Sequence, residues 1–208
     1  MHLELWLAFV AASAVLLIIP GPTILTVISL SVANDRGAKL PLVAGVTLGD
    51  STALVLSILG LGALLATAAF WFSLVKWAGG LYLLYLGIKL FRAGITAAGR
   101  PAAAAPRSRW RLFANTYLVT ALNPKGIVFF VAFLPQFISP AAPAGRQLLL
   151  LACTFVAMAT LNATLYSVFA GAARRLLASP RAQRRFNLAG GSILTAAGIL
   201  ALLARRPA

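Results

Sequence analysis

The chain has 208 residues, of which 61% are hydrophobic and only 10% are charged. This composition is typical of polytopic membrane proteins and excludes a soluble globular domain. A single cysteine and a single histidine exclude an internal disulfide and argue against a His/Cys metal site, so we expect no cofactor and no bound metal. The formal net charge is +15, but the basic residues fall between apolar spans. We therefore expect them to face the anionic lipid of the cytoplasmic leaflet and not nucleic acid.

The first apolar stretch runs from Leu3 to about Ala33 and is interrupted by Pro20-Gly21-Pro22. As one straight helix it would be about 45 Å long, whereas the hydrocarbon core of a bilayer is about 30 Å thick. Each proline lacks an amide hydrogen and frees the carbonyl four residues earlier, here those of Leu16 and Ile18. Polar backbone at this depth is tolerated only where it is buried in protein or lines a cavity. The break therefore marks a candidate site. We expect the first span to remain uncleaved, because the N-terminus lacks the basic leader of a signal peptide.

The second span, residues 41–66, carries Asp50 about nine residues from its start. A carboxylate at this depth is costly, and such residues are functional by default. The alternative is a structural partner for a neighbouring helix. Gly45 and Gly49 form a small-xxx-small pair, which predicts close helix packing beside Asp50.

The third span is expected at 71–92, and a cytoplasmic linker at about 96–111 follows it. The fourth span, 112–138, is broken at Asn123-Pro124-Lys125. Lys125 supports two interpretations: it extends toward the membrane interface, or it faces the same cavity as Asp50. The fifth span, 148–171, carries Asn162, and the sixth covers 188–204. Because arginine and lysine concentrate in the odd-numbered connections, the positive-inside rule places these connections in the cytoplasm and both termini outside.

The two halves of the chain repeat three landmarks in the same order. Pro22, Asp50 and Ala78-Gly79-Gly80 in the first half correspond to Pro124, Asn162 and Ala189-Gly190-Gly191 in the second. In both halves the double glycine is followed seven residues later by another glycine, Gly87 or Gly198. An odd number of spans per half gives the halves opposite orientations, which is an inverted repeat with a site near the membrane midplane.

We therefore predict an all-α polytopic membrane protein with one transmembrane domain, residues 1–208. Six helices form two inverted three-helix repeats, about 3–95 and about 112–204, and helices 1 and 4 are broken by proline. The glycines expected to serve helix packing are Gly45, Gly49, Gly79, Gly80, Gly87, Gly190, Gly191 and Gly198. A bundle with such faces could also form a homodimer.

A broken helix offers amides that attract an anion and carbonyls that attract a cation. A zwitterion needs both. An amino acid could place its carboxylate on the amides after Pro22 or Pro124, with Lys125, and its ammonium on freed carbonyls or on Asp50. The residues expected at a substrate or proton site are Pro20, Gly21, Pro22, Thr23, Asp50, Asn123, Pro124, Lys125 and Asn162.

Four motifs in this order resemble the lysine-exporter (LysE) family, and especially its homoserine/threonine-efflux (RhtB) branch. They are Pro20-Gly21-Pro22, the segment Gly45 to Asp50, the segment Trp77 to Gly87, and Asn123 to Phe130 with Phe133 to Phe137. The resemblance covers about residues 5–204. It implies an inner-membrane exporter of amino acids with six spans, driven by the proton gradient, and not an enzyme. Thr23 stands where the branch often has asparagine.

Within this resemblance we expect the cargo to be a neutral amino acid of the threonine, homoserine or leucine type, because the site offers one acid and one base. Asp50 would alternate between a proton and the substrate ammonium. Three alternatives remain open: a metal-cation exporter of a related family, a membrane scaffold without a transport cycle, and a membrane-embedded enzyme or redox carrier.

Overall fold

The structure is a computed structural model that describes residues 1–34, 36–65, 108–139 and 142–203, with positions 77, 81, 84–85, 88 and 91–92 between them. Every regular element in these ranges is a helix. The expected third span, including Gly79, Gly80 and Gly87, falls largely outside the described residues, as does most of the linker at 96–111. The all-helical prediction is confirmed for the described part of the chain.

The first apolar stretch forms two helices, α1 (Leu3–Ile18) and α2 (Pro22–Ala33). Their axes are bent by 52° at the break, which confirms that the stretch is not one straight helix. A short 3-10 turn, η1 (Arg36–Ala38), connects α2 to the long helix α3 (Lys39–Leu65).

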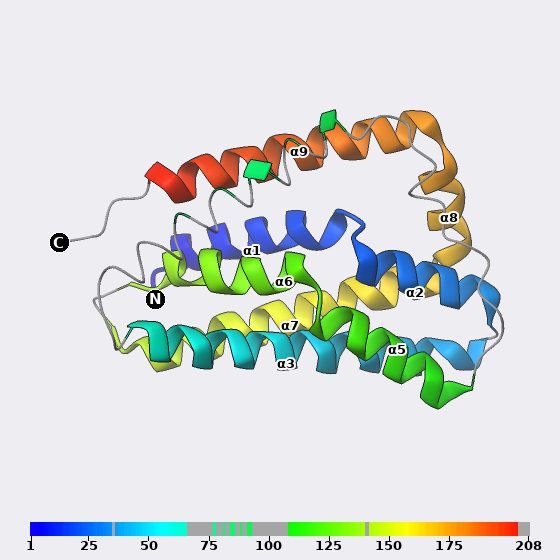
Figure 1. Cartoon of the computed structure of the whole chain (residues 1–208), viewed down its shortest axis with the longest axis horizontal. Helices are drawn as coiled ribbons and strands as arrows, with labels where there is room; N and C mark the ends of the chain where they lie inside the picture. The colour runs from blue at the N-terminus through cyan, green and yellow to red at the C-terminus, as the bar shows by residue number, and fades with distance from the viewer. Residues whose placement is uncertain are drawn as a thin grey trace.

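The second broken span begins with α5 (Arg109–Ala121) and continues after the break as α6 (Pro124–Val128). A π-helical turn, η3 (Phe129–Phe133), and a 3-10 turn, η4 (Leu134–Phe137), complete it. Figure 1 shows that α1 and α2 run along the bundle in one direction, whereas α5 and α6 run in the other, and that both breaks lie near its middle. The two interrupted spans are therefore antiparallel, and their irregular segments meet halfway along the bundle.

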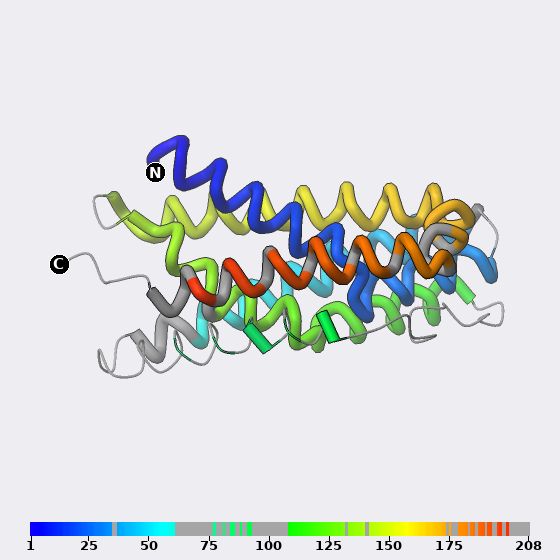
Figure 2. Tube along the Cα trace, turned by 90° about the horizontal axis from the view of Figure 1, so that it is seen from above, coloured from blue at the N-terminus to red at the C-terminus, as the bar shows by residue number. Residues whose placement is uncertain are grey.

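The long helix α7 (Ala144–Val168) packs against α3 and α1, while α3 also packs against α5. A short helix, α8 (Ala170–Ala178), then crosses the end of the bundle and packs on α2. The last helix, α9 (Pro180–Leu203), returns along the bundle beside α1 (Figures 1 and 2).

The basic region after α7, predicted as the connection to a span at 188–204, is largely helical in the structure. Arg175 lies on α8, and α9 already begins at Pro180. Proline is favoured at the first position of a helix, where its missing amide hydrogen would have no partner. The polar residues Arg181, Arg184 and Arg185 therefore form the first turns of α9 instead of a connection.

The starts of α3, α5 and α9, with α8, lie at one end of the bundle, whereas α1 begins and α9 ends at the other (Figure 1). Within the described residues, three helical segments are long and apolar enough to cross a membrane, Lys39–Gly60, Arg109–Phe137 and Ala144–Val168. The bent pair α1 and α2 makes a fourth if it counts as one span. These lengths and compositions establish a multi-pass arrangement, while the number of six spans stays a prediction.

An aromatic core fills the half of the bundle in which α1 begins and α9 ends. Phe9 of α1 is fully buried and contacts Phe129 and Phe137, with ring centroids 6.2 and 5.3 Å apart. Phe155 of α7 also belongs to this core, and its ring centroid lies 4.8 Å from that of Phe130 in an edge-on arrangement. The phenylalanines that recur at helical spacing after the second break thus form a packed core, as that spacing indicates.

Candidate functional site

The first break arises from the two prolines that flank Gly21. α1 ends at Ile18, and Ile19 is extended, with φ −68° and ψ 113°. Gly21 precedes the first residue of α2 in an extended conformation, and Pro22 takes that first position. Since an amide four residues later is missing or displaced, the last carbonyls of α1 lose the helical partners they would have in a continuous helix.

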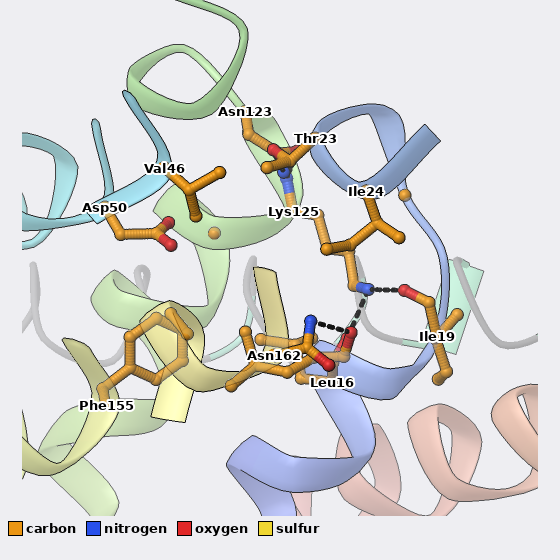
Figure 3. A pocket seen from close by; sticks show the side chains of 14 residues that line it. Leu16, Ile19, Thr23, Ile24, Val46, Asp50, Asn123, Lys125, Phe155 and Asn162 are labelled. Carbon is orange, nitrogen blue, oxygen red and sulfur yellow. Dashed lines mark hydrogen bonds between the residues drawn. The ribbon is translucent and has the colours of Figure 1, made fainter. Parts of the chain in front are cut away.

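Four consecutive carbonyls at this end of α1 accept hydrogen bonds from side chains of the second half. The Lys125 ammonium donates to the carbonyl oxygens of Leu16 and of Ile19, the latter at 2.8 Å. The Asn162 amide donates to Leu17 at 3.1 Å. The Tyr166 hydroxyl donates to Ile18 at 2.9 Å. We call these four oxygens the α1 carbonyl end (Figure 3 shows the contacts of Lys125 and Asn162).

The carbonyls predicted to be freed, those of Leu16 and Ile18, are among these four. The sequence reasoning missed Tyr166. It lies four residues after Asn162 on α7 and therefore on the same face of that helix, which is the signal that could have found it.

The second break is satisfied differently, by its own backbone and by Asn123. The side-chain oxygen of Asn123 accepts from the Lys125 amide at 3.1 Å, and its carbonyl accepts from the Gly126 and Ile127 amides. Its side-chain nitrogen donates to the Thr23 hydroxyl of α2 at 3.1 Å. The Asn123 residue thus caps α6 and joins it to the first turn of α2. The amides after Pro124, which could have received a substrate carboxylate, are already occupied.

Asp50 is positioned by the close contact between α3 and α5. A Cβ atom built on Gly49 would lie 2.7 Å from the Cβ atom of Thr120 and 2.9 Å from the carbonyl oxygen of Tyr117. On Gly45 it would lie 2.9 Å from the carbonyl oxygen of Phe113. Only glycine permits this approach, and it places the next residue, Asp50, beside the second break.

The Asp50 side chain is only 8% exposed, and its carboxylate points into a cavity between the two breaks (Figure 3). The Lys125 ammonium lines the same cavity. Among the described residues the carboxylate accepts no hydrogen bond, and it makes no ion pair within 4.0 Å with that ammonium. The cavity thus holds two side chains of opposite charge that are not paired with each other.

The cavity has a volume of about 40 Å³, and one water molecule needs about 10–15 Å³ by this measure. It therefore holds a few water molecules and no complete amino acid. Its polar lining comprises Thr23, Asp50, Asn123, Lys125 and Asn162, with Gly21 at the first break. Its apolar wall includes Leu17, Ile24, Val46, Phe155 and Ala159.

The structure thus brings six of the predicted site residues to one cavity. The other three, Pro20, Pro22 and Pro124, do not line it; they set the ends of the helices. Of the two interpretations of Lys125, the geometry matches the one in which it faces the cavity with Asp50. The four oxygens of the α1 carbonyl end already accept hydrogen bonds from side chains of the second half.

No group of three or more His, Cys, Asp or Glu side chains gathers in the part of the chain that the structure describes. The oxygen atoms that contact a cationic group there are the backbone carbonyls of Leu16 and Ile19, which accept from the Lys125 ammonium.

The family model of the LysE type translocator matches residues 14–205. The chain belongs to this family. The chain is 33% identical over 205 residues to the homoserine/homoserine lactone efflux protein of Salmonella typhimurium, and the match covers 99% of both chains. It is 34% identical over 153 residues to the leucine efflux protein of Salmonella choleraesuis, covering 73% of this chain and 72% of that one.

A further relative, from Vibrio cholerae, is 32% identical over 207 residues, 99% of this chain and 100% of that one, and is described only as an uncharacterized membrane protein. No solved structure matches the chain. The family is one of translocators and not of enzymes. Together with the apolar helices, these matches make the chain a multi-pass membrane protein of the LysE type translocator family.

Proposed function

We propose that this translocator exports neutral amino acids from the cytoplasm. The observation that carries the proposal is the pair of opposite charges, Asp50 and Lys125, which line one cavity without pairing with each other. A zwitterion can bind both side chains, its ammonium at Asp50 and its carboxylate at Lys125. Relatives that bear the names of efflux proteins for homoserine and for leucine support an amino acid as the cargo.

In the proposed complex, the substrate ammonium binds the Asp50 carboxylate. The substrate carboxylate binds near Lys125, whose ammonium carries three donors and spends two of them on the α1 carbonyl end. The first turn of α2, where Thr23 and Ile24 line the cavity, adds the positive end of a helix dipole. One acid and one base leave no second anion for a cationic side chain, which favours neutral cargo.

The side chain of the cargo would lie against the apolar wall of the cavity, near Val46, Phe155 and Ala159. Because the cavity admits only a few water molecules, binding requires this wall to move outward. In the proposed cycle the site opens to each side of the membrane in turn.

We further propose that the energy comes from proton exchange. Only three acidic residues occur in the chain, and Asp50 is the one in the middle of a span, whereas Glu4 lies in the first turn of α1. A proton that enters the cell down the membrane potential releases about 2.3 kcal/mol of free energy per 100 mV. An Asp50 that takes up a proton when it releases the substrate ammonium would couple the two movements.

The antiparallel course of the two broken spans supports the inverted repeat, and the shared end of the basic connections supports termini outside a bacterial cytoplasmic membrane. The landmarks 20–22 and 123–125 would then be equivalent parts of the two halves. Both statements remain proposals.

The experiment is counterflow in liposomes that contain the purified protein, with a panel of neutral and basic amino acids. Asp50→Asn removes one partner of the proposed buried charge pair between Asp50 and the substrate ammonium. Such a loss costs about 2–5 kcal/mol, so the exchange rate should fall about thirtyfold or more. Asp50→Glu should retain part of the rate. Glu4→Gln, which neutralises an exposed acid outside the cavity, is the matched control and should behave as the wild type. Wild-type rates for Asp50→Asn, or no exchange of any amino acid by the wild type, would reject the proposal.

A further inference from the structure

The α1 carbonyl end has the properties of a cation site. Backbone dipoles add along a helix, so the last carbonyls carry a partial negative charge that favours cations. In membrane transporters, interrupted helices commonly use such carbonyls to hold a small cation. Here the four oxygens belong to consecutive residues, Leu16 to Ile19, and two of them converge on one nitrogen atom, the Lys125 ammonium.

The occupant of this site is part of the protein itself. Lys125 reaches it from α6, 109 residues along the chain from Leu16, and its side chain passes Gly21, where a Cβ atom would lie 3.5 Å from the lysine Cδ atom. If the only role of Lys125 were to neutralise Asp50, we would expect the two charges to form an ion pair. They form none within 4.0 Å, and the ammonium binds the carbonyl oxygens instead.

We propose that the α1 carbonyl end is a binding site for a small monovalent cation and that Lys125 fills it as a tethered occupant. The wild-type protein consequently needs no free sodium, potassium or ammonium ion at this place. Removing the lysine side chain vacates the site, and a free primary ammonium ion of similar size can then take its position, because it offers the same N–H donors to the same oxygens.

The site has two further donors that stay in place when the lysine is removed. Asn162 continues to bind Leu17, and Tyr166 continues to bind Ile18. The oxygens of Leu16 and Ile19 are then the ones without a partner. Each lost bond to a charged donor costs about 1.5–3 kcal/mol, so the ratio of folded to unfolded protein should fall about tenfold or more.

The test measures thermal unfolding of the full-length protein in detergent. Lys125→Ala is compared with wild type in ethylammonium chloride and in tetramethylammonium chloride at equal concentration. Ethylammonium replaces the end of the lysine side chain, whereas tetramethylammonium has the same charge, no N–H donor and a larger size. We expect Lys125→Ala to unfold at a lower temperature than wild type in tetramethylammonium and to recover much of the difference in ethylammonium, with wild type unaffected by the exchange of salts.

Two variants distinguish loss of the cation site from two simpler effects of Lys125→Ala, the loss of side-chain volume and the loss of charge balance in the cavity. Lys125→Met fills the space of the side chain without a charge, so it should not respond to ethylammonium. Asp50→Asn combined with Lys125→Ala restores charge balance in the cavity; if Lys125 only neutralises Asp50, this double variant is as stable as wild type and no longer responds to ethylammonium. The cation site predicts that the double variant still responds.

The proposal is overturned if Lys125→Ala shows no difference between the two salts, if wild type or Lys125→Met responds as strongly, or if Lys125→Ala can be recovered folded in neither salt. Recovery of folded Lys125→Ala only when ethylammonium is present during purification supports it. A second arm, which rests on the proposed function, measures counterflow: ethylammonium should restore part of the rate of Lys125→Ala. If wild type exchanges no amino acid while the stability of Lys125→Ala still depends on ethylammonium, the exporter is rejected and the cation site stands.

Discussion

Replacing Gly49 with alanine tests whether the contact between α3 and α5 sets the position of Asp50. The new Cβ atom would lie 2.7 Å from the Cβ atom and 3.0 Å from the Cγ2 atom of Thr120, and 2.9 Å from the carbonyl oxygen of Tyr117. Carbon atoms in contact normally lie about 3.5–4.0 Å apart. A backbone oxygen cannot rotate away, so the two helices must separate by several tenths of an ångström or more. Overpacking of this kind costs about 1–3 kcal/mol.

Gly60 on the same helix provides the matched control, because a Cβ atom there would have no neighbour within 4 Å. Both substitutions gain helix propensity, about 1 kcal/mol for glycine to alanine. This gain cancels when the two variants are compared. Gly49→Ala should therefore be less stable than Gly60→Ala by about 1–3 kcal/mol, the full cost of overpacking.

The assay is thermal unfolding of both variants in the same detergent, followed by counterflow at a temperature at which both are folded. We expect Gly60→Ala to exchange substrate at the wild-type rate and Gly49→Ala to be slower, because the displaced helix carries Asp50. If Gly49→Ala unfolds at the same temperature as Gly60→Ala or higher, the close approach of α3 and α5 does not limit the side chain at this position, and our account of how Asp50 is held is wrong.

Two smaller changes address single hydrogen bonds. Tyr166→Phe removes the donor to the Ile18 carbonyl and should lower the free energy of unfolding by about 1 kcal/mol; unchanged thermal unfolding would show that this carbonyl does not need the hydroxyl. The Thr116 hydroxyl is buried and has no hydrogen-bond partner in the described part of the chain, so Thr116→Val should leave the stability unchanged or raise it. Thr160→Val loses the 2.7 Å hydrogen bond to the Thr47 hydroxyl and should lower the free energy of unfolding by about 1 kcal/mol. The reverse order of stability in the same unfolding assay would contradict this.

The sequence predicted the local features of the fold because proline and charge act locally. The break at 20–22 follows from two missing amide hydrogens, and the depth of Asp50 follows from counting residues in an apolar span. The close packing expected at Gly45 and Gly49 agrees with the distances to α5. The assignment of these residues to transport remains a prediction.

The partners across the bundle could not be predicted in the same way. Lys125 and the Ile19 carbonyl are 106 residues apart, and no periodicity fixes which face of α6 turns toward α1. The sequence therefore left two interpretations of Lys125 open. The predicted sixth span gives no start for α9, for a different reason. The sixth span was placed by hydropathy, which locates only the apolar residues after 188. The helix start is instead indicated by Ser179-Pro180, which combines an N-cap residue with proline at the first helical position.

The α1 carbonyl end also bears on how the protein is made. Leu16 to Ile19 are synthesised long before Lys125, Asn162 and Tyr166, which follow by 106 to 148 residues. When α1, α2 and α3 leave the ribosome, the side chains that donate to these oxygens have not yet been synthesised. The hydrogen bonds that Lys125, Asn162 and Tyr166 donate to the end of α1 can therefore form only after the second half of the chain has been made, and before then these oxygens need other partners, such as water.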